Sequence, residues 1–241
     1  MAAPTIPTVA ATRVLSNVQA DTSGTRTFPS LTGLTKNAGD LLIAIVFAYQ
    51  SSATANAVWS SWGGGFTEFG DFSTGTTVAI GCAYKISTGT ETGTFTVTQA
   101  ATVTGHATMM LLSIPGSSGI PEAGGYASGT NAAADPGALT PSWGSKDVLW
   151  IACAGCGETS TSGAFTGVTG DAANYASAVD TGISADVVGG LNGRIGFRQL
   201  TGSTDDPGTM AADTSNSRWG AITIGVRGTT IYQQTGKAVC F

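Results

Sequence analysis

Short apolar segments, separated by small and turn-forming residues, run along most of the chain. Residues 41–49 are apolar throughout, which predicts a central strand buried on both faces. In residues 93–99, threonines alternate with Phe95 and Val97, and this period of two predicts a strand with one solvated face. No segment keeps an apolar period of 3.6 over a useful length. The predicted strands are 13–19, 41–49, 66–72, 77–86, 93–99, 106–114, 148–154, 174–179, 190–200, 208–212 and 219–226.

Several of these segments occur twice, in the same order. Each series has an Asp before an apolar strand, a Phe-Thr pair, an aromatic-basic pair followed by Thr-Gly, and a final apolar strand. The matched segments are 39–45 with 146–152, Phe66-Thr67 with Phe165-Thr166, Tyr84-Lys85 and Thr88-Gly89 with Phe197-Arg198 and Thr201-Gly202, and 106–116 with 219–228. Four matches in order indicate an internal duplication.

The duplication predicts how the halves pack. One copy alone would expose the apolar face of its sheet, whereas two copies placed face to face cover each other. We therefore expect an all-β fold, an antiparallel, jelly-roll-like β-sandwich built from two related halves. The expected boundaries are an N-terminal strand or arm over 1–30, halves over about 31–116 and 136–228, a connection over 117–135 and a C-terminal extension over 229–241.

Composition narrows the functional classes. Charged residues make up 10% of the chain, against about a quarter in typical domains, and the net charge is −5. The ten basic residues form no cluster, so neither nucleic acid nor a membrane surface is an expected partner. The longest apolar run, 41–49, is shorter than the roughly 20 residues of a membrane-spanning helix. The N-terminal sequence lacks the pattern of a signal peptide, so synthesis in a cytoplasm is expected.

The residues that most often carry chemistry are few. The single histidine, His106, opens an apolar strand and is expected to pack. Cys153 and Cys156 have the spacing of half a zinc or redox site, but a second ligand pair is lacking, because Cys82 and Cys240 are isolated. We therefore expect no enzyme activity, no cofactor and no metal. Two alternatives stay open: a pair of catalytic carboxylates drawn from the four Glu and the Asp residues, and a hard cation such as calcium bound by Asp205 and Asp206 or by Asp171 with nearby loop carbonyls.

Aromatic residues near predicted loops are the candidate binding residues. Trp59 and Trp62 flank the sequence Trp-Ser-Ser-Trp-Gly-Gly-Gly, and Tyr126 lies in the long connection. Paired aromatic rings on a loop stack on sugars or anchor a protein partner. The alternative is that Trp59 and Trp62 close one end of the sandwich core. The sequence predicts Trp59, Trp62 and Tyr126 as partner- or glycan-binding residues.

The order of these motifs resembles that of β-sandwich proteins of tailed-bacteriophage particles, which occur among capsid-surface and tail-fibre components. The resemblance rests on 39–42, Gly65-Phe66-Thr67, Tyr84-Lys85, Thr88-Gly89 and Pro115-Gly116, and it covers roughly residues 30–230. The family often has Trp at the position of Phe66, and the second half matches less well, with Lys146 in place of Gly.

The resemblance implies a non-enzymatic virion protein on the particle exterior. It would decorate the capsid or join a tail appendage, act through contacts with other capsid or tail subunits, and form a homo-oligomer. A tail-fibre adhesin that binds a receptor or a host surface glycan is the first alternative, and a polysaccharide-degrading enzyme on a jelly-roll scaffold is the second.

Overall fold

The computed structural model describes residues 14–19, 25–49, 59–73, 78–99, 107–117, 119–158, 167–180, 190–212 and 217–228. Strands dominate this part of the chain, and its only helix is the short 3-10 turn η2 (Leu31–Gly33). The strands are β1 (Val14–Gln19), β2 (Thr25–Ser30), β3 (Ala38–Tyr49), β4 (Trp59–Trp62), β5 (Thr67–Phe72), β6 (Val78–Thr88), β7 (Thr94–Gln99), β8 (Ala107–Ile114), β9 (Glu122–Gly129), β10 (Ala133–Ala134), β11 (Lys146–Glu158), β12 (Ala176–Asp180), β13 (Leu191–Gly202), β14 (Met210–Ala211) and β15 (Ser217–Arg227). The fold is therefore all-β, as predicted.

Each half forms a five-stranded antiparallel sheet. The first has the order β1-β8-β3-β6-β5, and the second has the order β9-β15-β11-β13-β12. The two orders are the same when each strand is replaced by its counterpart in the other half. The apolar strands β3 and β11 lie at the centre of their sheets, where the sequence pattern placed buried strands. The duplication seen in the sequence is thus a duplication of topology.

In each half, strands from the two ends of the segment pair with each other. In the first half, β1 pairs with β8, β2 with β7 and β3 with β6, so that the strands pair from the ends of the segment inward. In the second half, β9 pairs with β15, β10 with β14 and β11 with β13. This nested antiparallel pairing is that of a jelly roll. The sequence predicted one jelly-roll-like sandwich made from both halves, whereas the structure has this nested pairing within each half, and each half encloses a core of its own.

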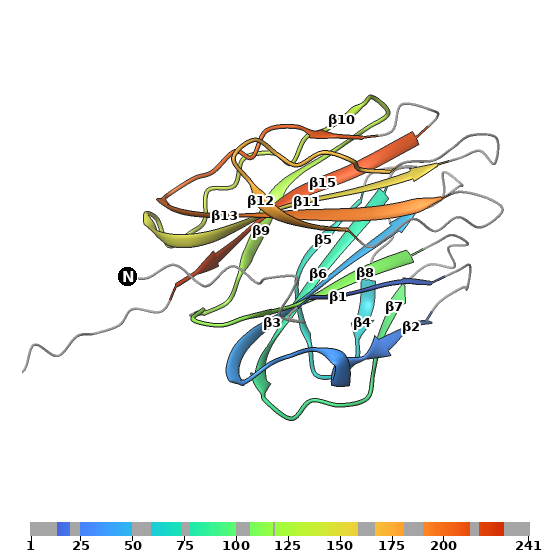
Figure 1. Ribbon diagram of the computed structural model, residues 1–241, viewed down its shortest axis with the longest axis vertical. Coiled ribbons are helices and arrows are strands. Elements are labelled where there is room, and N and C mark those ends of the chain that lie inside the picture. Colours follow the sequence, from blue (N-terminus) through green and yellow to red (C-terminus); the bar gives the residue numbers. More distant parts are fainter. Residues whose placement is uncertain are drawn as a thin grey trace, which may run out of the picture.

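The molecule has four layers, as Figure 1 shows along its vertical axis. The two five-stranded sheets face each other in the middle and share one core. The small sheet β2-β7-β4 covers the outer face of the first and encloses a second core, and the pair β10-β14 with nearby loops encloses a third core on the second. The predicted face-to-face packing of the halves is present. The two outer layers, which the sequence did not predict, protect the other face of each sheet.

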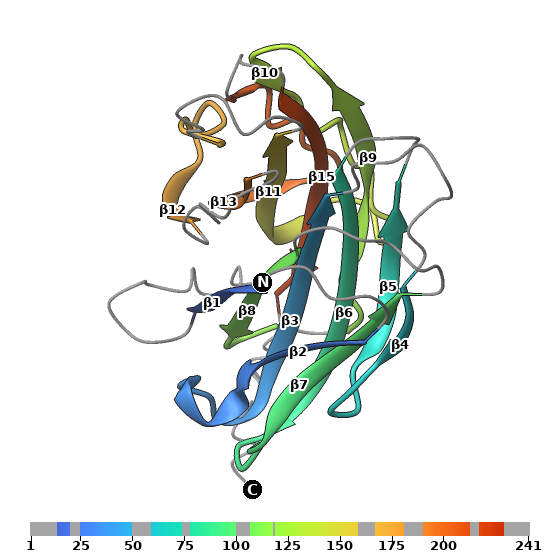
Figure 2. The same cartoon turned by 90° about the vertical axis from the view of Figure 1, so that its right-hand side faces the viewer.

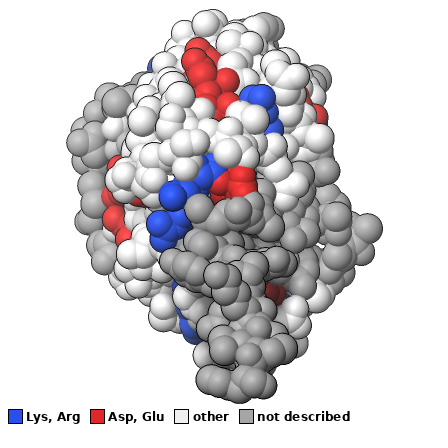
Figure 3. Space-filling view, turned by 90° about the vertical axis from the view of Figure 1, so that its left-hand side faces the viewer, with Lys and Arg blue, Asp and Glu red and all other residues white. Residues whose placement is uncertain are grey.

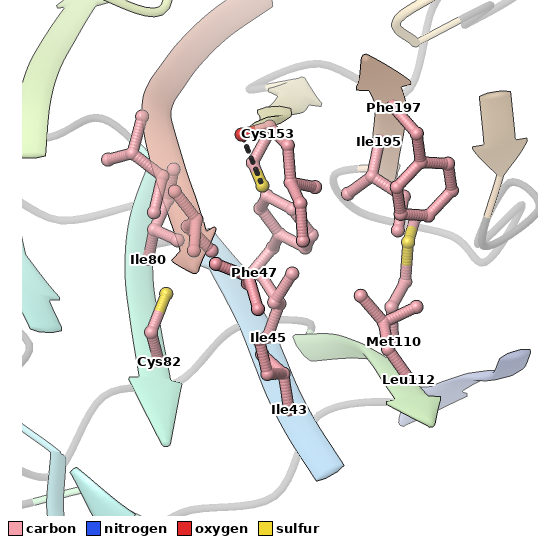
Figure 4. Close-up of a cluster of buried hydrophobic side chains, with 14 of the residues drawn as sticks. Ile43, Ile45, Phe47, Ile80, Cys82, Met110, Leu112, Cys153, Ile195 and Phe197 are labelled. Carbon is pink, nitrogen blue, oxygen red and sulfur yellow. Dashed lines mark hydrogen bonds between the residues drawn. The ribbon is translucent and has the colours of Figure 1, made fainter. Parts of the chain in front are cut away.

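The central core joins the halves with approximate two-fold symmetry. Strand β6 lies opposite β15, and β8 lies opposite β13, so each half presents the same pair of strands to its counterpart. Figure 4 shows Phe47 in this core with Ile45, Ile80, Cys153 and Ile195 around it. A β-carbon on either Gly155 or Gly193 would lie 2.5 Å from the Phe47 ring. Two glycines of the second half thus make room for this ring of the first.

Strand β9 lies within the segment 117–135, which was predicted as a connection. The segment does carry the chain from the first sheet to the second, but it also supplies the edge strand that pairs with β15. Its sequence, rich in Gly and Ala, has no apolar alternation, so the pattern that identifies strands was missing. At the edge of the sandwich β9 packs beside β5, as seen at the right of Figure 2. The predicted extension, 229–241, lies outside the described residues.

The structure also corrects the alignment of the repeat. Leu41 and Ile43 face the central core, whereas Val148 and Trp150, aligned with them by sequence, face the outer core of the second half. In β11 the residues that face the central core, as Leu41 and Ile43 do, are Leu149 and Ile151, one position later than the sequence alignment gives. A shift of one residue matters because successive side chains of a strand point to opposite faces. The aligned pair Phe165-Thr166 lies outside the described residues, and Tyr175 occupies the place of Phe66 in the fold. Both aromatic residues are buried: Phe66 lies just before β5 and Tyr175 just before β12. The backbone N–H of each donates a hydrogen bond to the carbonyl three residues earlier.

Candidate functional site

Trp59, the first predicted binding residue, lies in the outer core of the first half. The sequence placed it beside a loop, but β4 is a strand that pairs with β7. Only 2% of Trp59 is exposed, and its ring covers the backbone of Gly81 on β6. A ring held in this way cannot stack on a sugar or a partner from solution. The packing alternative therefore describes Trp59.

Trp62, at the other end of β4, is half-buried. Its ring lies 6.2 Å from that of Trp59 and 6.1 Å from that of Phe95. Its indole Nε1 donates a hydrogen bond of 2.7 Å to Oε2 of Glu68, an exposed residue of β5. Gly64 and Gly65, which follow in the turn, are exposed. Trp62 is thus an aromatic surface residue with a carboxylate beside it.

Tyr126, the third predicted residue, holds the halves together. Its ring stacks on Phe72 with the ring centres 5.9 Å apart and the planes at 11°. Its hydroxyl donates a hydrogen bond of 3.2 Å to the carbonyl of Val78. Because Tyr126 packs on the central core and the Trp pair on the outer core, the structure does not unite the three predicted residues in one site.

Two carboxylates that the sequence did not single out lie beside the tryptophans. A β-bulge in β5 between Glu68 and Gly70 lets Glu68 and Asp71, three residues apart, point to the same outer face. Oδ2 of Asp71 accepts a hydrogen bond of 3.0 Å from the backbone N–H of Trp59. Burial, opposed by this hydrogen bond and reinforced by the charge of Glu68, raises the pKa of Asp71 to about 6. Each carboxylate of β5 therefore fastens one end of β4.

A second acidic residue outside the prediction, Glu91, closes the turn between β6 and β7. Its carboxylate accepts hydrogen bonds from the backbone N–H and hydroxyl of Thr88 and from the hydroxyl of Ser87, and Lys85 Nζ lies 3.8 Å away. Burial alone would raise the pKa of Glu91, but these bonds and its own backbone N–H lower it to about 2. The carboxylate is a structural anchor of the turn.

We expect Glu91→Gln to remove part of the acid sensitivity of the fold. A lowered pKa means that the ionised carboxylate stabilises the folded state above pH 4.5, and that this contribution is lost as the pH falls toward about 2. Urea unfolding from pH 6 to pH 2.5 should show a smaller loss of stability in the variant than in the wild type. Glu122→Gln, which changes a carboxylate on β9, is the control, and an equal effect of both substitutions would contradict this role.

The second half has the same arrangement with stronger partners. Asp205, which follows the Thr-Gly turn as Glu91 does, is buried and pairs with Arg198 Nη1 at 3.0 Å. Its other oxygen accepts the hydroxyl proton of Tyr175 in a hydrogen bond of 2.5 Å. Burial and this hydrogen bond raise the pKa of Tyr175, which keeps the phenol protonated. Each half therefore pairs a basic residue with a buried acidic residue that follows it in the sequence. The acidic residue after each Thr-Gly turn was the sequence signal that could have identified this pair.

The structure shows how the Asp and Cys residues that the sequence offered as metal ligands are used. Both oxygens of Asp205 are engaged, and Asp171 is paired with Arg194 at 2.7 Å. Cys153 faces the central core and Cys156 the outer core, because residues three apart in a strand point to opposite faces. Within the described residues there is no group of three or more side chains suited to hold a metal ion. His106 and Cys240 lie outside those residues.

The surface carries few charges. On the face seen in Figure 3, acidic and basic side chains form small separate groups, and most of the other described residues are uncharged. No helix in the described part of the chain is long and apolar enough to cross a membrane. Comparison of the chain with protein-family models, with curated proteins and with solved structures found no match.

Proposed function

We propose that this chain is a non-enzymatic structural protein on the exterior of a tailed-bacteriophage particle, where it decorates the capsid or forms part of a tail appendage. The observation that carries the proposal is that the polar residues common to both halves make contacts within the fold. Lys85 with Glu91, and Arg198 with Asp205, hold turns of the sandwich. Asp40 and Asp147 likewise accept hydrogen bonds from Ser113 and Thr201 beside the central strands. The repeated motifs thus build a scaffold.

The topology supports the same proposal by analogy. Jelly rolls occur in viral capsid and lectin domains, although a fold by itself does not determine function. A scaffold with few charges and many small polar residues suits close contact with neighbouring subunits, since such side chains lose little rotamer entropy when they are ordered. We infer that the chain acts through such contacts, as a homo-oligomer or beside other virion subunits.

Mass spectrometry of purified particles tests the proposal. Particles separated from lysate proteins on a density gradient should contain the chain in many copies, at a constant ratio to the major capsid protein across the particle peak. A chain that stays in the soluble fraction, or whose ratio to capsid varies across the peak, would contradict a structural role.

Binding of a host surface glycan is the second candidate, and the half-buried ring of Trp62 next to Glu68 favours it. We expect Trp62→Ala to weaken adsorption to host polysaccharide about tenfold, the equivalent of about 1.4 kcal/mol. Trp59 is unsuitable for this test, because its loss would disturb the core. Trp143→Ala, which removes a half-buried tryptophan of the second half, is the matched control. Equal adsorption of the wild type and the Trp62 variant would exclude this ring as the binding group.

A further inference from the structure

Strand β4 has an unusual attachment to the first half. Among the described strands its ladder runs only to β7, and its other side faces β5, which belongs to a different sheet. Two side chains bridge that side: Asp71 accepts the backbone N–H of Trp59 at 3.0 Å, and Glu68 accepts the indole N–H of Trp62 at 2.7 Å. Beneath the strand lies the aromatic part of the outer core, including Phe95. Release of these two bonds would detach one side of β4 and expose that core.

The second half provides an internal comparison. Val168 forms an isolated β-bridge with Ala212, just after β14, and lies seven residues before Tyr175. In the first half, Trp59 pairs with Gln99, the last residue of β7, and lies seven residues before Phe66. The backbone N–H of Val168 is also taken up by a side-chain oxygen, here Oδ1 of Asn192 at 2.9 Å. The same backbone donor is therefore accepted by a neutral amide in one half and by an ionisable carboxyl in the other.

We propose that β4 is a pH-sensitive clasp, closed on β5 when Asp71 is protonated and loosened when Asp71 is ionised, whereas the equivalent segment at Val168 does not respond to pH. This inference goes beyond the structural role proposed above and does not depend on it. The ionised carboxyl is disfavoured where it lies, since it is half-buried and shares its face with the carboxylate of Glu68.

Among the described residues, the groups that influence Asp71 include no cation that would offset this cost. On β6, the nearby Cys82 is a buried thiol whose pKa burial raises well above its usual value, so it stays neutral. Strand β4 itself has no ionisable side chain, and neither do residues 50–58 and 74–77 in the sequence. On β9, the carboxylate of Glu122 accepts a hydrogen bond from the backbone N–H of Ser142, and the hydroxyl of Tyr126 donates one to the carbonyl of Val78. Within the described part of the chain, Glu68 is thus the charged group that faces Asp71, and its charge is of the same sign.

The direction and size of the effect follow from linkage. In the closed state the pKa of Asp71 is about 6, and release into water would return it toward 3.8. The closed state therefore binds the proton more tightly, so closure is favoured below pH 3.8 and weakens as the pH rises through about 6. A difference of about 2 pKa units corresponds to an opening equilibrium on the order of 100-fold larger at pH 7.5 than at pH 3.5.

Amide hydrogen exchange of the full-length protein tests the clasp. After correction for the intrinsic pH dependence of exchange, the protection of the Trp59 amide should fall on the order of 100-fold between pH 3.5 and pH 7.5, while that of Val168 stays constant. Asp71→Asn, which reproduces the neutral acceptor of the second half, should make Trp59 equally insensitive to pH. Glu68→Gln should keep a transition at Trp59 but move it to a lower pH than in the wild type, because the substitution removes the like charge that raises the pKa of Asp71.

The alternative outcomes are distinct. Protection of Trp59 that rises with pH, or that follows the same profile at Trp59 and Val168, would overturn the proposal. So would an unchanged profile in Asp71→Asn. If that variant does not fold, the comparison of the two amides within the wild type still decides, together with the carboxyl carbon shift of Asp71, whose titration midpoint should lie near pH 6.

Discussion

Replacing Phe47 by alanine is expected to lower the free energy of unfolding by about 3–5 kcal/mol. The ring is fully buried at the centre of the interface between the two halves. It fits against Gly155 and Gly193 of the second half, so neighbouring side chains cannot easily close the resulting cavity. Equilibrium unfolding in guanidinium chloride, with the native baseline checked by circular dichroism, measures the change.

Ile120→Ala is the matched control for this prediction. Ile120 is also a large apolar residue, but 60% of it is exposed, so its truncation should change the stability by no more than about 0.5 kcal/mol. A loss of less than about 1 kcal/mol in the Phe47 variant would mean that the two halves do not share a tightly packed core.

The second large effect is expected for Asp205→Ala, which should cost about 2–4 kcal/mol. The substitution leaves the buried hydroxyl of Tyr175 without its acceptor and the guanidinium of Arg198 without its carboxylate. Urea unfolding at neutral pH would measure this loss. Because both partners belong to the turn and strand that close one end of the second half, we expect the unfolding transition to stay cooperative.

The adjacent residue supplies the control for Asp205. Asp206 is exposed, and its carboxylate accepts a long hydrogen bond of 3.4 Å from the backbone N–H of Gly208. Asp206→Ala should therefore cost well under 1 kcal/mol, in line with other exposed turn positions. Similar losses for the two variants would show that the Arg198–Asp205–Tyr175 contacts do not stabilise the fold.

The strands that the sequence predicted are those whose burial dictates their pattern. Strand β3 is apolar throughout because both of its faces are covered, and β7 alternates because one face meets the outer core and the other meets solvent. Strand β9 escaped prediction, since its Gly- and Ala-rich sequence is suited to close packing and has no apolar period. The strands β2, β4 and β10 were not predicted either. Strands β4 and β10 are only four and two residues long, too short to show a period of two.

The repeat could be recognised from the sequence, but the face of the sheet to which each of its residues points could not. Aligning Asp40 with Asp147 is natural from the letters, yet β3 has an irregular register between Ala38 and Leu41 that shifts the alternation by one residue. Such a bulge leaves no signal in a single sequence. The face of each core residue is therefore known only from the pairing of strands.

The candidate site shows the same limit. The sequence identified the Trp59–Trp62 pair, but whether a ring faces solvent or core depends on the layer above it, which the sequence did not predict. The partners of these rings, Glu68 and Asp71, come from another strand and share a face only because of the bulge in β5. Contacts between segments that fold together in space determine the chemistry of this region.

A density map of the purified phage particle tests the structural role most directly. We predict that the exterior of the capsid or tail carries repeated copies of a four-layered body made of two stacked jelly rolls, with the chain in contact with neighbouring subunits. A complete map whose exterior contains no density of this shape, or in which the chain lies inside the particle, would contradict the proposed function.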